Sequence, residues 1–201
     1  MQSGLFSNSS ENLLPFDGET KYFDEFFLKV EADQFFKQLM TQIKWRQEPI
    51  KLFGKAIMQP RLTALYGNPD KPYGYSGIEM QAFPWTDFLM EIKTRVEGKA
   101  QASFTHVLLN YYRDGRDSMG WHRDNEAVLG PNPTIASISF GETREFQIRH
   151  YVEKKVRLKV SLDHGSLLIM SGSSQHYWQH QIPKTSKNLG PRINLTFRKI
   201  Q

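Results

Sequence analysis

Two histidines and one aspartate in this sequence have the types and spacing to bind a metal ion together. His122 and Asp124 are separated by one residue, and on an extended backbone residues two apart point the same way. The third ligand must come from a distant strand, and the aromatic segment 175–180 offers both His176 and His180, between which spacing does not choose. Two imidazoles and a carboxylate are the ligand set of a facial iron(II) site, which leaves positions open for co-substrate and oxygen. An isolated His-x-Asp is also common in surface turns, so the residues around it decide the interpretation.

A regular alternation of polar and apolar residues follows, from Arg192 to Arg198. It predicts a strand whose apolar face carries Ile193, Leu195 and Phe197 and whose polar face carries Arg192, Asn194, Thr196 and Arg198. Guanidinium groups bind carboxylates through paired N–H donors, so we expect the two arginines to hold the two ends of a small diacid. The alternative is an exposed sheet face with no ligand.

Residues 104–112 show the same alternation. It places Asn110 and Tyr112 on one face of a strand, together with His106 and Leu108. Polar groups on a buried sheet face need hydrogen-bond partners, so we expect Asn110 and Tyr112 to donate to the same ligand.

The composition fits one compact domain. The chain has 201 residues, of which 39% are hydrophobic, enough to bury a sizeable core. It has no cysteine, so a metal site here must use histidine and oxygen ligands. Residues 1–15 are polar and serine-rich, and we expect a flexible lead-in there and a single domain over residues 16–201. Without a secretory signal or a membrane-spanning run, we expect an intracellular monomer with no membrane contact, in the cytoplasm of a bacterium or the nucleus of a eukaryote.

The positive charge is concentrated in one half of the chain. From Arg144 onward there are eleven lysines and arginines against three acids, a net charge of +8 that leaves −3 for residues 1–143. A basic half favours a polyanionic partner such as nucleic acid. The alternative is an ordinary solvated surface.

The hydrophobic periodicity changes from helical to strand-like along the chain. Apolar residues at helical spacing predict helices over residues 31–45 and 85–97, the second punctuated by Pro84 and Gly98. Short apolar runs predict strands over residues 104–112, 135–140, 145–150, 156–160, 167–170 and 193–197. The pattern predicts an α+β, mainly β fold, a sandwich or jelly roll with the helices packed on one face.

Four segments carry a family resemblance, namely residues 110–115, 120–124, 137–141 and 191–200. They resemble the AlkB family of iron(II)- and 2-oxoglutarate-dependent dioxygenases, which repair alkylated nucleic acid, and are most similar to the human family member that acts on duplex DNA. The resemblance runs from about Leu14 to the C-terminus. It implies a double-stranded β-helix, a relative of the jelly roll, with a nucleotide-recognition lid.

The resemblance also implies roles for individual residues. In the family, the last metal ligand precedes the first of the two arginines by the interval seen here from His180 to Arg192. The resemblance therefore prefers His180 to His176 and implies that His122, Asp124 and His180 hold iron(II). The co-substrate 2-oxoglutarate would be bound by Arg192 and Arg198, with help from Asn110, Tyr112 and Asn194. With O2, the implied reaction demethylates 1-methyladenine or 3-methylcytosine in DNA and releases formaldehyde, succinate and CO2. The alternatives are an RNA demethylase of the same family and a catalytically silent nucleic-acid-binding jelly roll.

Chemistry on a base in a duplex requires that the base be flipped out. By resemblance, residues 46–82 form a finger and lid and residues 100–201 the catalytic jelly roll. Tyr73 and Tyr75 would stack on the flipped base, and Glu126 would read its exocyclic amine. Phe53, Gly54 and Lys55 match a finger that wedges into the base stack.

The sequence departs from the duplex-acting relative at two places. Asn125 stands where a second acid is expected after Asp124, at a position expected to contact the substrate. The loop over residues 151–155 is shorter than the basic loop that reaches the complementary strand in that relative. Single-stranded DNA and RNA therefore stay open as substrates, with Lys154, Lys155, Arg157 and Lys159 as candidate phosphate contacts.

Overall fold

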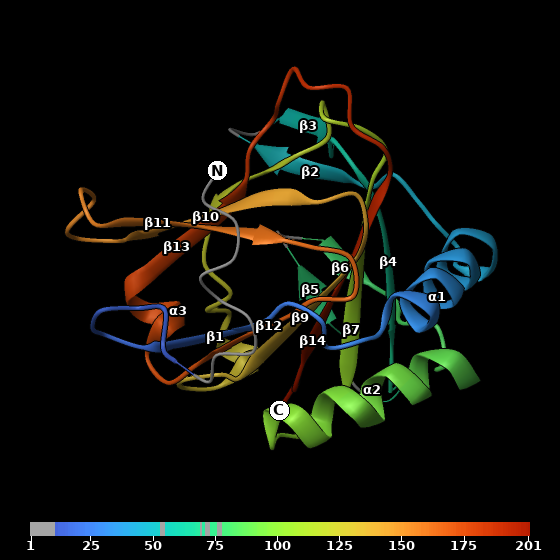
Figure 1. Ribbon diagram of the computed structural model, residues 1–201, viewed down its shortest axis with the longest axis horizontal. Coiled ribbons are helices and arrows are strands. Elements are labelled where there is room, and N and C mark those ends of the chain that lie inside the picture. The colour runs from blue at the N-terminus through green and yellow to red at the C-terminus, as the bar shows by residue number, and fades with distance from the viewer. Residues whose placement is uncertain (1–10, 53–54, 69, 71–72, 76–77) are drawn as a thin grey trace.

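The computed structural model describes residues 11–201 except 53–54, 69, 71–72 and 76–77, and within 50–56 and 71–80 the description is confined to the backbone. Two antiparallel sheets form the body of this part of the chain (Figure 1). The larger has six strands in the order β1 (Glu19–Phe23), β12 (Leu167–Ser171), β9 (Ile135–Gly141), β14 (Arg192–Arg198), β7 (His106–Tyr112) and β4 (Leu62–Gly67). The smaller has four, in the order β11 (Arg157–Leu162), β10 (Arg144–His150), β13 (Trp178–Ile182) and β8 (Met119–His122).

The two sheets pack face to face through one hydrophobic cluster. It joins Leu108, Tyr112 and Leu168 of the six-stranded sheet to Phe146 and Trp178 of the four-stranded one. Sequence-distant strands become neighbours, since β14 lies between β9 and β7 in a fully antiparallel register. This is the jelly-roll arrangement that the strand pattern predicts.

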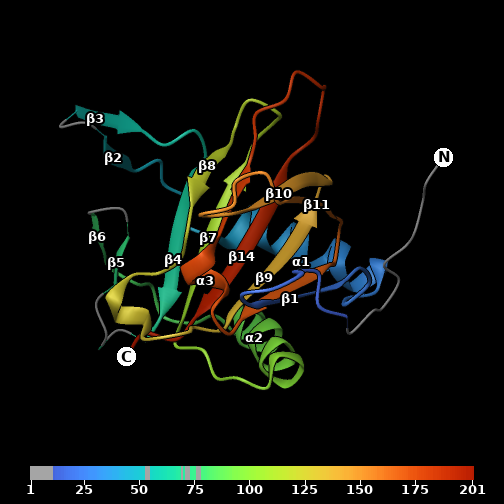
Figure 2. The same cartoon turned by 90° about the vertical axis from the view of Figure 1, so that its left-hand side faces the viewer.

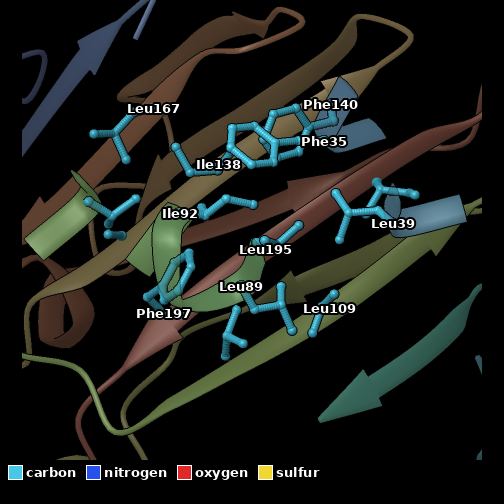
Figure 3. Close-up of a cluster of buried hydrophobic side chains, with 14 of the residues drawn as sticks. Phe35, Leu39, Leu89, Ile92, Leu109, Ile138, Phe140, Leu167, Leu195 and Phe197 are labelled. Atoms are coloured by element: carbon cyan, nitrogen blue, oxygen red, sulfur yellow. The ribbon is translucent and has the colours of Figure 1, made fainter. Parts of the chain in front are cut away.

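A second cluster covers the other face of the six-stranded sheet. Helices α1 (Lys29–Gln42) and α2 (Asp87–Ala100) lie on that face, as Figure 2 shows. Figure 3 shows Phe35, Leu89 and Ile92 of the helices against Leu195 and Phe197 of β14. The predicted packing of both helices on one face is confirmed.

The helix ends differ from the predictions for local reasons. Helix α1 begins at Lys29, where Glu31 accepts the main-chain N–H of Leu28, and it ends before Ile43, which is extended and buried. Helix α2 runs past Gly98, so the predicted stop there is wrong. The left-handed position that ends it is taken by Gln101, at φ 49°, whose N–H bonds to the carbonyl of Glu97.

All six predicted strands are present, with ends within two residues of the prediction. Strands β1, β4, β8 and β13 of the two sheets were not predicted, and all but β13 lie at a sheet edge. Two small hairpins complete the described strands, one of β2 (Pro49–Leu52) and β3 (Lys55–Met58), the other of β5 (Tyr73–Tyr75) and β6 (Ile78–Met80). The short elements are the 3-10 helix η1 (Ala127–Leu129) and the one-turn helix α3 (Ser174–Tyr177). Among the described residues, no helix has the length and apolarity to cross a membrane.

Candidate metal centre and co-substrate pocket

The structure brings His122, Asp124 and His180 together, with one ligand atom from each lying within 4.8 Å of the others. The two histidines are directly paired across β8 and β13, and their ring centroids are 4.2 Å apart. Asp124 is 1% exposed and lies two residues past the end of β8, in the segment that follows the strand. His176 lies on α3 and is exposed, outside this cluster. The fold therefore selects His180 where spacing left both histidines open.

The tautomer of His122 is fixed by its backbone contact. Its Nδ1 lies 2.8 Å from the carbonyl oxygen of Gly120, and because a carbonyl only accepts, Nδ1 carries the proton. The lone pair of Nε2 is then left on the side of Asp124, whose Oδ1 is 3.9 Å away. Burial lowers the pKa of His122, and burial together with the neighbouring His122 lowers the pKa of His180 to about 3. Both imidazoles are thus neutral at physiological pH, the form that ligates a metal.

Asp124 is held as a carboxylate by its neighbours. Burial by itself would raise its pKa, but the positive charge of Arg198 and its hydrogen bond to the carboxylate lower it. Arg198 Nη2 donates to Asp124 Oδ1 at 2.8 Å, and both side chains are almost fully buried. The Asp124 main-chain N–H is donated to Gln175 Oε1 at 2.9 Å.

The polar face of β14 lines the same pocket as these three residues. Arg192, Asn194, Thr196 and Arg198 all border it, with Asn110 and Tyr112 of β7 beside them. The whole strand is buried, which excludes the alternative of an exposed sheet face. The apolar face of the same strand, Ile193, Leu195 and Phe197, belongs to the helix-covered core, as the alternation predicts.

Arg192 has the contacts expected of a buried carboxylate site. It is 1% exposed, its Nη2 donates to Ser139 Oγ at 2.9 Å, and its Nε and Nη1 have no partner. The guanidinium lies 5.2 Å from the Tyr112 ring centroid. Burial lowers the pKa of Arg192 to about 10, so it remains a cation. A buried cation whose Nε and Nη1 are unpaired needs an anion to complete its hydrogen bonds.

The other predicted co-substrate residues already have partners within the protein. Asn194 Nδ2 donates to Ser137 Oγ at 2.7 Å and to the carbonyl of Ile138 at 3.0 Å. Asn110 Oδ1 accepts from Arg61 Nε at 2.7 Å. Together with the Arg198–Asp124 pair, these bonds join the polar side chains of the pocket wall to one another and to the backbone.

Three buried residues that support the site were not predicted from the sequence, namely Arg61, Ser139 and Gln175. Ser139 had a signal, because it lies on the same face of the Ser-Ile-Ser alternation in β9 as Ser137, directly across from Asn194. Arg61 and Gln175 had none, since each acts through a contact between segments about fifty residues apart.

The predicted substrate residues are only partly described. Phe53 and Gly54 lie outside the described residues, and for Lys55, Tyr73 and Tyr75 the backbone alone is described, in β3 and β5. Asn125 is exposed and Glu126 half-buried, at the N-cap of η1. Neither of these two lines the pocket, so their contact with a substrate stays a prediction.

The donor set fits iron(II), because it consists of two neutral imidazoles and one carboxylate in a pocket that is also lined by Arg192, a buried arginine with unpaired donors. The chain belongs to the 2OG-Fe(II) oxygenase superfamily, whose sequence model matches residues 19–198. Within it the chain belongs to the AlkB family, since it is 38% identical over 184 residues to human DNA oxidative demethylase ALKBH2, covering 87% of this chain and 70% of that protein. The predictions of the family and of its cofactors are confirmed.

Other relatives fit the same conclusion. The chain is 43% identical over 182 residues to mouse alpha-ketoglutarate-dependent dioxygenase alkB homolog 3, covering 85% of this chain and 62% of that protein. The chain thus spans about 62% of the length of the alkB homolog 3 proteins of mouse and human. The structure of OsALKBH1 superposes with a TM-score of 0.66 at 17% identity, over 90% of this chain and 97% of that one, which confirms the predicted jelly-roll fold.

Proposed function

We propose that this protein is an iron(II)- and 2-oxoglutarate-dependent dioxygenase that demethylates N-alkylated bases in DNA, with 1-methyladenine and 3-methylcytosine as the substrate type. The observation that carries the proposal is a single pocket that combines candidate metal ligands with candidate donors for a carboxylate. It holds the clustered donors of His122, Asp124 and His180 beside the unpaired guanidinium donors of Arg192. The named relatives, a DNA oxidative demethylase among them, support the substrate class.

Iron(II) at the three ligands, with 2-oxoglutarate and O2, supplies the oxidation of the N-methyl carbon when bound. Arg192 would bind a carboxylate of the co-substrate through its unpaired Nε and Nη1 donors. Arg198 keeps Asp124 ionised and aimed at the histidines. The hydrophobic contacts of Phe146 with His180 keep water from the reacting groups. The hydroxylated methyl group then leaves as formaldehyde, together with succinate and CO2 from the co-substrate.

Cationic side chains at one edge of the four-stranded sheet support a nucleic-acid partner. Lys154, Lys155, Arg157 and Lys159 are exposed on edge strand β11 and the turn before it. Arg123, next to the ligand His122, lies 4.1 Å from the Tyr151 ring centroid at this same turn. The cations therefore extend from the sheet edge to the residue beside the metal ligands, a path that a phosphate backbone could follow.

The two hairpins within residues 46–82 are the proposed finger and lid. In that arrangement Phe53, Gly54 and Lys55 would enter the base stack, and Tyr73 and Tyr75 would stack on the flipped base. Asn125 and Glu126 would approach the base from the turn that follows Asp124. An enzyme acting on DNA would work inside the cell, in bacterial cytoplasm or in a nucleus, and we propose that it does so as a monomer.

The test uses two histidines from the same segment. His180→Ala should abolish succinate and formaldehyde release on a 3-methylcytosine oligonucleotide, whereas His176→Ala, an exposed position on α3, should keep near-wild-type turnover. Mass spectrometry of the oligonucleotide should show the loss of one methyl group. Retained turnover in His180→Ala would refute the metal assignment.

Parallel reactions separate the remaining alternatives. The same lesion is presented in single-stranded DNA, duplex DNA and single-stranded RNA, each at two salt concentrations. Turnover highest on RNA would replace the DNA proposal by an RNA demethylase. Salt-sensitive binding without turnover on any strand would identify a silent nucleic-acid-binding jelly roll.

A further inference from the structure

The one-turn helix α3 contacts the segment after β8, which carries the candidate metal ligand Asp124. Gln175 on α3 is 1% exposed, and its Oε1 accepts the main-chain N–H of Asp124 at 2.9 Å. Since a backbone N–H only donates, the amide oxygen must face Asp124, and Nε2 then points to Met170 Sδ at 3.4 Å. The orientation of this glutamine is thereby determined at both ends.

A second bond joins the same two segments. Arg123 Nη1 donates to the carbonyl oxygen of His176 at 2.7 Å. Trp178, which directly follows α3 and begins β13, donates through Nε1 to the carbonyls of Phe16 and Asp17 at 3.1 Å each. Helix α3 is thus bonded to the Asp124 segment through its own residues and is followed by a side chain that is bonded to residues 16–17.

Asp124 needs such a support because the sheet does not provide it. Strand β8 ends at His122, so no ladder partner fixes the backbone of Asp124 as His180 fixes that of His122. The ligand is nonetheless 1% exposed, and an N–H buried there without an acceptor would be costly. Gln175 provides that acceptor and also fixes the position of the Asp124 main chain from which the carboxylate extends.

We propose that Gln175 is a positioning residue for the metal site. It holds the Asp124 main chain so that the carboxylate faces the two imidazoles before the metal arrives. The inference rests on the metal site of the proposed enzyme but not on its substrate. Outer contacts of this kind change metal affinity by about 10- to 100-fold when they are removed.

The experiment titrates Co(II) alone into the metal-free protein and follows the visible d–d absorption, which reports affinity and ligand geometry without turnover. Gln175→Met keeps the side-chain length and removes the amide oxygen, and it should bind Co(II) about 10- to 100-fold more weakly with altered bands. Gln175→Glu keeps an oxygen acceptor for the Asp124 N–H and should bind Co(II) more tightly than Gln175→Met. Gln59→Met is the matched control, because Gln59 is equally buried at 1% exposure but makes no contact with Asp124.

Each outcome bears on the inference separately from the proposed function. Wild-type affinity and bands in Gln175→Met would overturn it, as would an equal loss in Gln59→Met, which would indicate general destabilisation. A loss in Gln175→Glu as large as in Gln175→Met would show that the acceptor oxygen is not what matters. If wild type itself binds no Co(II), the metal site and the proposed function fail as well.

Discussion

Arg192→Met should separate co-substrate affinity from stability, because the two depend on this side chain in opposite ways. In the unliganded protein the Arg192 guanidinium is buried with its Nε and Nη1 unpaired, and its Nη2 donates to Ser139 Oγ. Removing a buried charge that lacks a partner relieves a desolvation cost, so methionine, of similar length, should leave the unliganded protein as stable as wild type or more so.

The affinity for 2-oxoglutarate should fall steeply in the same variant. Each hydrogen bond to a charged group contributes about 1.5–3 kcal/mol, so losing the two from Nε and Nη1 would weaken binding by about 3–6 kcal/mol. That corresponds to a dissociation constant at least about 100-fold higher. Calorimetric titration of 2-oxoglutarate into the Co(II)-loaded protein measures the affinity, and thermal unfolding of the unliganded protein measures the stability.

Arg144→Met is the matched control, since Arg144 is also buried beside the Tyr112 ring. Its guanidinium, however, donates to the carbonyls of Asp114, Asp117 and Pro183 at 2.8–3.1 Å. Its loss should cost about 1–3 kcal/mol for each buried carbonyl left unpaired and should not change the affinity for 2-oxoglutarate. The reasoning is refuted if Arg192→Met destabilises the unliganded protein and binds 2-oxoglutarate as wild type does.

Three further predictions concern stability. Burial and His122 lower the pKa of His180 to about 3 from 6.5, so the unfolded chain binds more protons below pH 6.5. The metal-free protein should lose stability as the pH falls from about 6.5, and His180→Asn should flatten that slope in urea unfolding; an unchanged slope contradicts the assignment. Phe197→Ala should cost about 3–5 kcal/mol and Val152→Ala, 71% exposed, less than about 0.5, so equal losses would contradict the packing. Gly18→Ala should lower the melting temperature, because Gly18 has φ +140° and a Cβ would lie 2.6 Å from Ser174 Cα; an unchanged melting temperature would contradict this contact.

The sequence predicted the parts of the fold that a local pattern specifies. The period-two alternation of residues 192–198 predicted both faces of β14. The strand is buried on both sides, and its apolar face packs in the helix-covered core while its polar face lines the pocket. The two helices followed from apolar spacing, but their ends did not, because Gln101 and not Gly98 ends α2. Strand β1 was missed because its five residues lie at a sheet edge and show too little pattern to predict.

The predictions for the site divide in the same way. Residue types and order predicted the ligands, and the family resemblance preferred His180, which the pairing of β13 with β8 then brings beside His122. No pattern could predict that Gln175 meets Asp124, because that contact exists only when α3 and the turn after β8 are both in place. The roles of Tyr73 and Tyr75 remain predictions, since only their backbone is described.

The central place of β14 has a consequence for how this chain is synthesised. The strand is translated after both of its neighbours, β9 and β7, yet it pairs with each of them along almost its entire length. Until β14 emerges from the ribosome, those two neighbours present unpaired backbone edges, and the growing polypeptide is prone to intermolecular association. Nonsense mutations upstream of codon 192 would therefore yield aggregating fragments and not merely inactive ones.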